Sequence, residues 1–242
     1  MIPFIKEQTL IGQYFSNIDN LIKLQQQKYE KLLNLKKSLL YKLFPKEGKT
    51  VPELRFEGFS GKWEKKKLGE VLTYRNGKAH EKNIVTKGKF IVVNSKFVST
   101  KGAFVKFSNI QIQPLYKNEI VFVLSDVPNG KAIAKTFLID IDNVYTLNQR
   151  IAGLKVTEAF NPYFVYLLLN KNEYFLKFDD GVNQTNLSKK DVIEFETFYP
   201  NINEQTLIGQ YFSKLDKLIE LSKEKLEKLK NVKESLLDKM FV

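Results

Sequence analysis

Residues 7–44 read EQTLIGQYFSNIDNLIKLQQQKYEKLLNLKKSLLYKLF, and residues 204–241 read EQTLIGQYFSKLDKLIELSKEKLEKLKNVKESLLDKMF. The two segments align without a gap, are identical at 25 of 38 positions, and stand near the two ends of the 242-residue sequence. A long repeat of this kind indicates that one structural unit is used twice. We therefore expect two equivalent arms with a different kind of structure between them.

Apolar residues recur in both segments at alternating steps of three and four, the heptad pattern of a long amphipathic helix. In the first segment the predicted pairing positions are Ile11, Tyr14, Ile18, Leu21, Leu32, Leu35 and Leu39. In the second segment they are Ile208, Tyr211, Leu215, Leu218, Leu229, Val232 and Leu236. Because a helix with such a stripe must bury it, we predict that the arms pair as an antiparallel coiled coil.

Gln25 and Ser222 interrupt the two apolar stripes at their middle. In an antiparallel pair these positions would lie close together, and a polar core contact fixes register at a cost in stability. An incidental polar substitution is the alternative interpretation. Pro45 bounds the first helix, and Pro3 and Pro200 precede the two helices at equivalent positions.

Between the arms, helical periodicity gives way to short β-rich runs that are separated by turn signals. The runs are Lys89–Ser95, Glu119–Leu124, Ala132–Ile139 and Ile151–Val156. Residues 162–169 read as a buried helix with Asn161 as its N-cap and Pro162 at its first position. We therefore predict an α+β fold, with one mixed α/β domain over residues 45–203 between arms at residues 1–44 and 204–242.

The formal net charge is +12, and its distribution is uneven. Residues 46–135 hold 18 basic and 8 acidic side chains, whereas residues 136–203 hold 6 basic and 9 acidic ones. A basic concentration of this kind favours nucleic acid as a partner. A generally lysine-rich composition is the alternative, although it does not explain the asymmetry.

The composition also bears on the compartment and on chemistry. The chain has no cysteine, which excludes disulfides and cysteine nucleophiles and fits a reducing compartment. The opening residues MIPFIKEQ lack the basic and apolar regions of a secretion signal, and no apolar run approaches the roughly 20 residues of a membrane helix. We expect a cytoplasmic protein.

Motifs of catalysis are weak in this sequence. His80 has no cysteine or second histidine near it, so no metal site is predicted. Residues 161–164 (NPYF) are similar to the Asn-Pro-Pro-Tyr/Phe motif of adenine methyltransferases but lack its second proline. Pro52-Glu53 with Glu64-Lys65-Lys66 loosely resembles a metal-dependent nuclease, a spacing that is common by chance. We predict a binding protein with no catalytic residue and no cofactor of its own.

Residues 51–71 (VPELRFEGFSGKWEKKKLGEV) resemble the opening of a target-recognition domain in type I restriction–modification specificity subunits. Residues 181–212 (GVNQTNLSKKDVIEFETFYPNINEQTLIGQYF) resemble its closing segment, and both arms are similar to the conserved spacer helices of that family. The resemblance implies a DNA-reading subunit whose helices also dock methyltransferase subunits. S-adenosylmethionine, ATP and Mg²⁺ would then belong to the methyltransferase and restriction subunits.

A complete specificity subunit of that family has the order domain–helix–domain–helix, whereas this chain has helix–domain–helix. Residues 1–6 look like the tail of a further domain, so the chain is similar to a half-length form. Two copies related by a two-fold axis would read an inverted repeat, which makes a homodimer the expectation. The alternatives are an intramolecular helix pair that fuses or recombines with other subunits, and a non-catalytic coiled-coil interaction protein that no longer reads DNA.

Recognition domains of that family differ with the sequence that they read, so DNA contacts are chosen here by chemistry. Lysine, arginine and small hydroxyls contact phosphates, whereas arginine, asparagine, glutamine and lysine read base edges. A solvated surface position is the alternative for each candidate, and the run Lys65–Lys67 is either a phosphate anchor or a solvated edge. The candidates in turn-rich stretches are Arg75, Asn76, Lys78, Asn94, Ser95, Lys96, Thr100, Lys101, Asn129, Lys131, Asn148, Gln149 and Arg150.

Overall fold

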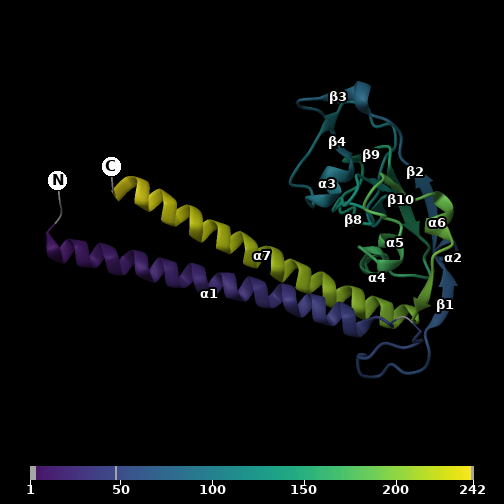
Figure 1. Cartoon of the computed structure of the whole chain (residues 1–242), viewed down its shortest axis with the longest axis horizontal. Helices are drawn as coiled ribbons and strands as arrows, with labels where there is room; N and C mark the ends of the chain where they lie inside the picture. The colour runs from purple at the N-terminus through teal and green to yellow at the C-terminus, as the bar shows by residue number, and fades with distance from the viewer. Residues whose placement is uncertain (1–3, 47, 241–242) are drawn as a thin grey trace. The chain divides into compact units, whose positions relative to one another are not determined.

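The computed structural model describes residues 4–46 and 48–240, which divide into two compact units. The helical unit joins the residues up to Leu43 to those from Tyr211 onward, and the globular domain spans Phe44–Gln210. We describe each unit by itself (Figure 1). Residues 1–6, interpreted above as the tail of a further domain, lie partly outside the described residues.

Two long helices, α1 (Ile5–Leu43) and α7 (Ile202–Met240), correspond to the two sequence repeats. Each has 39 residues and is therefore about 58 Å long at 1.5 Å per residue. The prediction of a long helix at each end of an α/β domain is confirmed. Within the described residues, neither these helices nor any other is apolar enough over a sufficient length to cross a membrane.

Side-chain contacts along the helical unit show that α1 and α7 run in opposite directions (Figure 1). Lys233 Nζ lies 2.5 Å from Asp19 Oδ1, and Lys36 Nζ lies 2.5 Å from Asp216 Oδ1. Between them, Gln25 Nε2 donates hydrogen bonds to the backbone oxygen and the hydroxyl of Ser222, both at 2.9 Å. The two polar interruptions of the apolar stripes therefore meet near the middle of the pair.

The buried seam differs from the predicted pairing positions in one respect. Tyr14, Leu21 and Leu35 are 51%, 53% and 43% exposed, and their counterparts Tyr211, Leu218 and Val232 are 38%, 54% and 51% exposed. The apolar residues of each arm form three adjacent lines along the helix surface, which we call columns. A single partner helix covers only two of the three columns. The covered positions in α1 are Ile11, Phe15, Ile18, Ile22, Gln25, Tyr29, Leu32, Lys36, Leu39 and Leu43. Those in the part of α7 that belongs to the helical unit are Phe212, Leu215, Ile219, Ser222, Leu226, Leu229, Lys233 and Leu236.

Two four-stranded sheets form the centre of the globular domain. One is antiparallel throughout, in the order β2 (Leu72–Asn76), β10 (Ile151–Val156), β6 (Ile120–Val123) and β8 (Thr136–Leu138). The other has the order β3 (Ile84–Val85), β5 (Phe107–Ser108), β4 (Phe90–Val93) and β9 (Tyr145–Leu147), with β4 and β9 parallel. Strand β10, a continuous apolar run in the sequence, is central and buried over Ile151–Leu154.

Two smaller sheets and several short helices complete the domain. Strand β1 (Glu64–Lys67) pairs with β12 (Glu196–Tyr199), so the chain enters and leaves the domain side by side. Strand β7 (Ser125–Asp126) pairs with β11 (Thr185–Asn186). The helices are α2 (Leu68–Val71), the 3₁₀ turn η1 (Glu81–Asn83), α3 (Ser95–Ser99), α4 (Pro162–Leu169), α5 (Glu173–Leu176) and α6 (Lys189–Ile193). Asn161 Oδ1 accepts from Phe164 N at 3.0 Å, so α4 is the asparagine-capped helix that was predicted.

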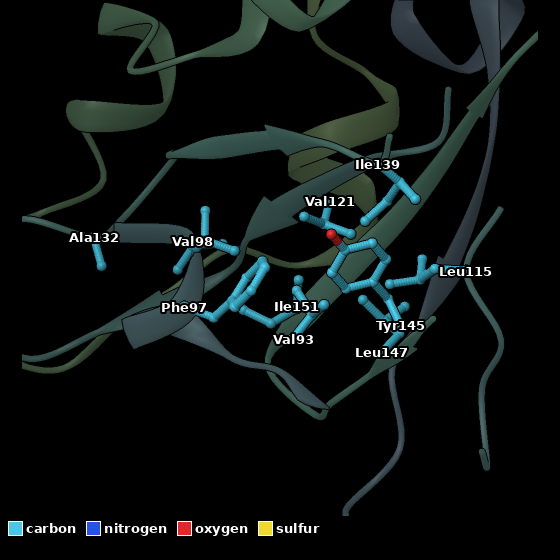
Figure 2. Packing of buried hydrophobic residues seen from close by; sticks show 11 residues of the cluster. Val93, Phe97, Val98, Leu115, Val121, Ala132, Ile139, Tyr145, Leu147 and Ile151 are labelled. Carbon is cyan, nitrogen blue, oxygen red and sulfur yellow. The ribbon is translucent and has the colours of Figure 1, made fainter. Parts of the chain in front are cut away.

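The main hydrophobic core takes side chains from both four-stranded sheets and from α3, as Figure 2 shows. Phe97 of α3 packs edge-on against Phe137 and Tyr145, with ring centroids 5.0 and 5.8 Å apart. Leu147 and Ile151 lie in the same cluster, one on each side of the turn between β9 and β10. The core therefore anchors the turns that carry most of the predicted DNA-contacting residues.

Candidate nucleic-acid interface

Three of the candidate turns, at residues 76–78, 94–96 and 148–150, meet through backbone hydrogen bonds. Asn148 N donates to Val93 O at 3.1 Å, and Gln149 N donates to Lys78 O at 3.1 Å. A side chain at Gly77 would place its Cβ 1.9 Å from the backbone oxygen of Asn148, so only glycine permits this approach. The structure thus brings together candidates that are about 70 residues apart in the sequence.

His80 holds this arrangement from inside the domain. The side chain is fully buried, with Nδ1 2.7 Å from Lys78 O and Nε2 2.8 Å from Thr146 Oγ1. Thr146 Oγ1 also accepts a hydrogen bond from Gln113 N at 3.1 Å, so the buried imidazole is linked to two further segments of the domain. His80 is therefore an internal brace of the 76–80 segment.

Arg75 is committed to an internal ion pair. Its Nη2 lies 2.6 Å from Glu119 Oε2 and 2.6 Å from the backbone oxygen of Pro114, and its Nη1 donates to Gln113 at 2.9 Å. Glu119 is only 4% exposed. A Cβ at Gly153 would lie 3.2 Å from Arg75 Nε. Because glycine has no Cβ, the Arg75 side chain has room beside this position. The structure thus gives Arg75 internal partners that support the fold, and its role as a DNA contact stays a prediction.

Most of the candidate amides and hydroxyls also make internal hydrogen bonds, which shape the turns that present the cations. Ser95 is half-buried at the first position of α3. Three asparagines accept hydrogen bonds: Asn76 from Tyr74 Oη, Asn148 from His80 N, and Asn94, the N-cap of α3, from Phe97 N. Asn129 donates to Gly181 O, and Gln149 donates to Glu81. The hydroxyl of Thr100 donates to Lys96 O and accepts from Phe104 N.

The candidate cations have a different environment. Lys78, Lys101, Lys131 and Arg150 are exposed, and over the described ranges none of them forms an ion pair. Lys96 lies with its Nζ 3.8 Å from the centre of the Phe104 ring. These side chains are the part of the predicted set that is available to an anionic ligand.

A lysine cluster gathers around Lys135, which the sequence did not single out. Lys135 Nζ donates to the backbone oxygen of Ser99 at 3.2 Å, and Lys171 N donates to Ala134 O at 2.8 Å. Burial lowers the pKa of Lys135 below its ordinary value; the positive neighbours Lys171, Lys101 and Lys131 lower it further, and the carboxylate of Asp126 acts in the opposite direction. We call these four side chains the lysine cluster. Mutual repulsion of this kind is relieved when an anion such as a phosphate binds.

The turn that carries Lys131 is built around a single carboxylate. Asp126 accepts hydrogen bonds from the backbone N–H groups of Val127, Ala132 and Ile133. A Cβ at Gly130 would lie 2.2 Å from that carboxylate, so the turn closes only over a glycine. The position of Lys131 is therefore fixed by the backbone before any ligand arrives.

The run Lys65–Lys67 is neutralised within the fold. In strand β1, Lys65 pairs with Glu196, Lys66 with Glu64 and Lys67 with Glu194. Of these pairs, Lys65–Glu196 joins the entering and leaving strands, Lys66–Glu64 lies within β1, and Lys67 reaches Glu194 at the end of α6. The run therefore lies on a solvated edge with its charges matched.

The two motifs that resembled catalytic sites have other surroundings. Asn161, the first residue of the NPYF segment, caps α4. In the part of the chain that the structure describes, no three histidine, aspartate or glutamate side chains gather as they do around a metal ion.

Residues 60–231 match the protein family described as "Type I restriction modification DNA specificity domain". The chain belongs to this family. The type I restriction enzyme MjaVIII specificity subunit of Methanocaldococcus jannaschii is 25% identical over 266 residues, which cover 98% of this chain and 60% of that protein. The putative MjaX specificity subunit of the same organism is also 25% identical, over 98% of this chain and 57% of its own length. Both relatives are named as specificity subunits of type I restriction enzymes.

Solved structures of specificity subunits have the same fold. The S subunit from M. genitalium superposes with a TM-score of 0.66 at 19% identity, over 96% of this chain and 60% of that one. The HsdS subunit from Thermoanaerobacter tengcongensis gives a TM-score of 0.59 at 14% identity, over 99% of this chain and 58% of that one. This specificity-domain chain thus spans about three fifths of the length of the proteins that it matches.

Proposed function

We propose that this chain is a half-length DNA-specificity subunit of a type I restriction–modification system, and that its globular domain reads one half of a split DNA site. The observation that carries the proposal is the match of residues 60–231 to a DNA-specificity family, and the exposed cations Lys78, Lys101, Lys131 and Arg150 on the turns of the globular domain support it. Lysines on fixed turns supply phosphate contacts and set the register of a protein on the duplex. The domain then presents its remaining polar groups to the base edges.

Arg150 is the residue that we propose for base reading. It lies in the turn between β9 and β10 with φ at 66°, and its backbone oxygen accepts from Leu124 N at 3.0 Å. Its guanidinium group has no internal ion pair among the described residues, in contrast to that of Arg75. An arginine on such a rigid turn is suited to bidentate hydrogen bonding with a guanine in the major groove.

The exposed third column of each arm supports docking of methyltransferase subunits. The exposed positions of α1 recur in α7 at equivalent sites of the repeat, so the chain offers two similar apolar surfaces. Two similar surfaces fit two copies of one partner, and methyltransferase subunits that supply S-adenosylmethionine chemistry are the proposed occupants. The columns are Leu10, Tyr14, Leu21, Leu24 and Leu35 on α1, and Leu207, Tyr211, Leu218, Leu221 and Val232 on α7.

A homodimer would give this chain two reading heads. One globular domain binds one half-site, so two copies related by a two-fold axis would bind an inverted repeat. A helix of about 58 Å spans roughly 17 base pairs at about 3.4 Å per pair, enough to separate the half-sites by more than one turn of DNA. A restriction subunit that uses ATP and Mg²⁺ would join the same assembly.

Equilibrium binding of the purified chain to a random-sequence DNA duplex at several salt concentrations tests the DNA-binding step. We expect affinity to fall steeply with salt, because each neutralised phosphate releases counterions. Absence of binding at low salt would contradict the proposal. It would favour the alternative in which the helix surfaces are the functional part of an interaction protein.

A further inference from the structure

The two most exposed of the larger apolar side chains described in the globular domain lie on neighbouring turns. Val182 is 77% exposed and Val127 is 64% exposed. Strand β7 ends directly before Val127 and β11 begins shortly after Val182, and these two strands pair with each other. Single exposed apolar residues are ordinary on protein surfaces, whereas two of them on adjoining turns raise the question of what they contact. We call residues 126–130 and 180–183 the valine turns.

Further hydrogen bonds tie the valine turns to each other. Asn129 Nδ2 donates to Gly181 O at 2.8 Å, and Gln184 Nε2 donates to Ser125 Oγ at 2.7 Å. A Cβ at Gly181 would lie 3.0 Å from Asn129 Oδ1, so the two segments approach closely. The valine turns therefore form one unit of the domain surface.

Each valine turn is closed by an aspartate carboxylate. Asp126 Oδ1 accepts from Val127 N at 2.9 Å, and Asp180 Oδ1 accepts from Val182 N at 2.9 Å. Asp126 also accepts from two further backbone N–H groups, and Asp180 accepts from both the backbone and the side chain of Asn183. Because the N–H groups of both valines are occupied, these residues offer a ligand their apolar side chains.

The valine turns stand at the end of the antiparallel sheet that also carries Arg150. Strand β6 ends where β10 begins, because Val123 lies opposite Ile151. Beyond that pair, Leu124 N donates to Arg150 O at 3.0 Å, and Leu187 N donates to Leu124 O at 2.8 Å. The turn with Arg150 therefore lies beside the segments that lead into and out of the valine turns.

Cations accompany the valine turns at this end of the sheet. Lys131 directly follows the first turn, is exposed, and forms no ion pair among the described residues. Strand β8 begins at Thr136 opposite Phe122, near the end of β6, so Lys135 lies at this end as well. Positive groups of this kind hold a duplex by its phosphates. Charge complementarity thus favours DNA over a protein as the ligand that the valines contact.

We propose that Val127 and Val182 recognise thymine by its 5-methyl group in the major groove. Thymine alone among the four bases presents a methyl group there, and apolar side chains contact it. A cytosine at the same place would instead turn its amino group toward an apolar side chain and lose a hydrogen bond to water. The inference rests on the proposed function and deepens it, because it assigns part of the half-site to a thymine.

Replacement of thymine by uracil in the DNA isolates this contact. Uracil keeps the hydrogen-bonding groups of thymine and lacks only the methyl group. The preferred duplex of the full chain is first selected from a randomised pool, and uracil then replaces each of its thymines in turn. We expect the affinity of the wild-type chain to fall about fourfold at the contacted position, which is the effect of one buried methyl group.

A chain that carries both Val127→Ser and Val182→Ser should bind the thymine and uracil duplexes with equal affinity. It should keep the wild-type salt slope, since no cation is changed, and the wild-type melting temperature, since both side chains are exposed. Ile141→Ser is the matched control, because Ile141 is 53% exposed and follows the other end of β8. This control should keep the discrimination between thymine and uracil.

Equal affinity of the wild-type chain for every uracil duplex and its thymine parent would overturn the inference. Discrimination that survives in the double serine variant would overturn it too. The same titrations measure DNA binding itself. A chain that binds DNA without sensing the methyl group contradicts this inference alone, whereas a chain that binds no duplex contradicts the proposed function as well.

Discussion

Single side chains in this protein separate into those that hold the turns and those that face outward. Arg75 and Arg150 illustrate the division, because both are arginines in turn-rich segments that chemistry alone marks as base readers. Arg75 is tied to the buried Glu119, whereas Arg150 stands on a turn without an internal ion pair in the described structure. Only the long-range contact, which no local sequence pattern reveals, distinguishes them.

Substitution of Arg75 by alanine should destabilise the domain. It leaves Glu119 buried without its partner, which costs about 3 kcal/mol in systems of this kind. The free energy of unfolding in urea measures the loss. Arg150→Ala is the control and should change that free energy by less than about 0.5 kcal/mol. Equal effects of the two substitutions would contradict the assignment.

Arg150→Ala should instead relax sequence preference. If Arg150 reads a base, discrimination at one position of the site should fall by about 1–3 kcal/mol while the other positions keep theirs. Selection of bound sequences from a randomised duplex pool measures this. Unchanged preference at every position would remove Arg150 from the base-reading set.

Lys101→Ala should weaken DNA binding uniformly across sequences. A phosphate contact carries no sequence information, so its loss reduces affinity for every duplex and lowers the salt slope by about one. Binding isotherms at several salt concentrations test this directly. A variant with the wild-type slope would show that Lys101 faces solvent only.

Lys135→Met should separate stability from DNA affinity. The folded-state pKa of Lys135 lies below its ordinary value, so the charged form opposes folding. This cost is fully present below the folded-state pKa, including neutral pH, and it fades as pH rises toward the ordinary lysine value of about 10.5. The variant should lose DNA affinity, and any stability that it gains at neutral pH should shrink toward pH 10.5. A gain independent of pH would contradict the charge explanation.

The two long helices show which of their features the sequence pattern predicts and which it does not. The repeat of 38 residues predicts two long helices, and the heptad spacing predicts that each buries an apolar face. The heptad spacing does not predict which two of the three apolar columns are covered, because Tyr14 and Phe15 are adjacent aromatic residues and either could lie in the covered face. The structure covers Phe15 and leaves Tyr14 outside, a choice that depends on the partner helix.

The Gln25–Ser222 contact is predicted to set the register of the helix pair. Gln25→Leu together with Ser222→Leu should raise the melting temperature, because an apolar core pair replaces a polar one. The same change should permit alternative registers, which cross-linking of cysteines introduced at Asp19 and Lys233 would detect as a loss of yield. A double variant that melts lower, or keeps a single register, would contradict this role.

The exposed columns are predicted to bind partners and not to stabilise the chain. Leu21→Glu with Leu218→Glu should abolish association with a methyltransferase subunit while the melting temperature stays the same, because both side chains are more than half exposed. Leu226→Glu in the covered seam is the matched control and should lower the melting temperature. Retained association of the exposed-column variant would rule out docking on this face.

In the globular domain, the sequence predicted the fold class and several of the helices and strands. It did not predict which of these elements lie next to one another. Pro162–Leu169 and Ile151–Val156 were recognisable because their signals are local, a capped helix and a continuous apolar run. The lysine cluster could not be recognised from the sequence, because Lys135 and Lys171 are neighbours only through a backbone contact between distant segments.

At the scale of the whole molecule, a globular domain that we propose to read DNA is joined to helices that offer two similar surfaces, and the central claim is that the chain gives a methyltransferase its sequence preference. The most direct test is a genome-wide map of adenine methylation in cells that express this chain with a type I methyltransferase subunit, against cells that lack the chain. We expect new methylation at one split motif, which is symmetric if two copies of the chain act together. No chain-dependent methylation, with both proteins present and associated, would contradict the claim that this chain reads DNA.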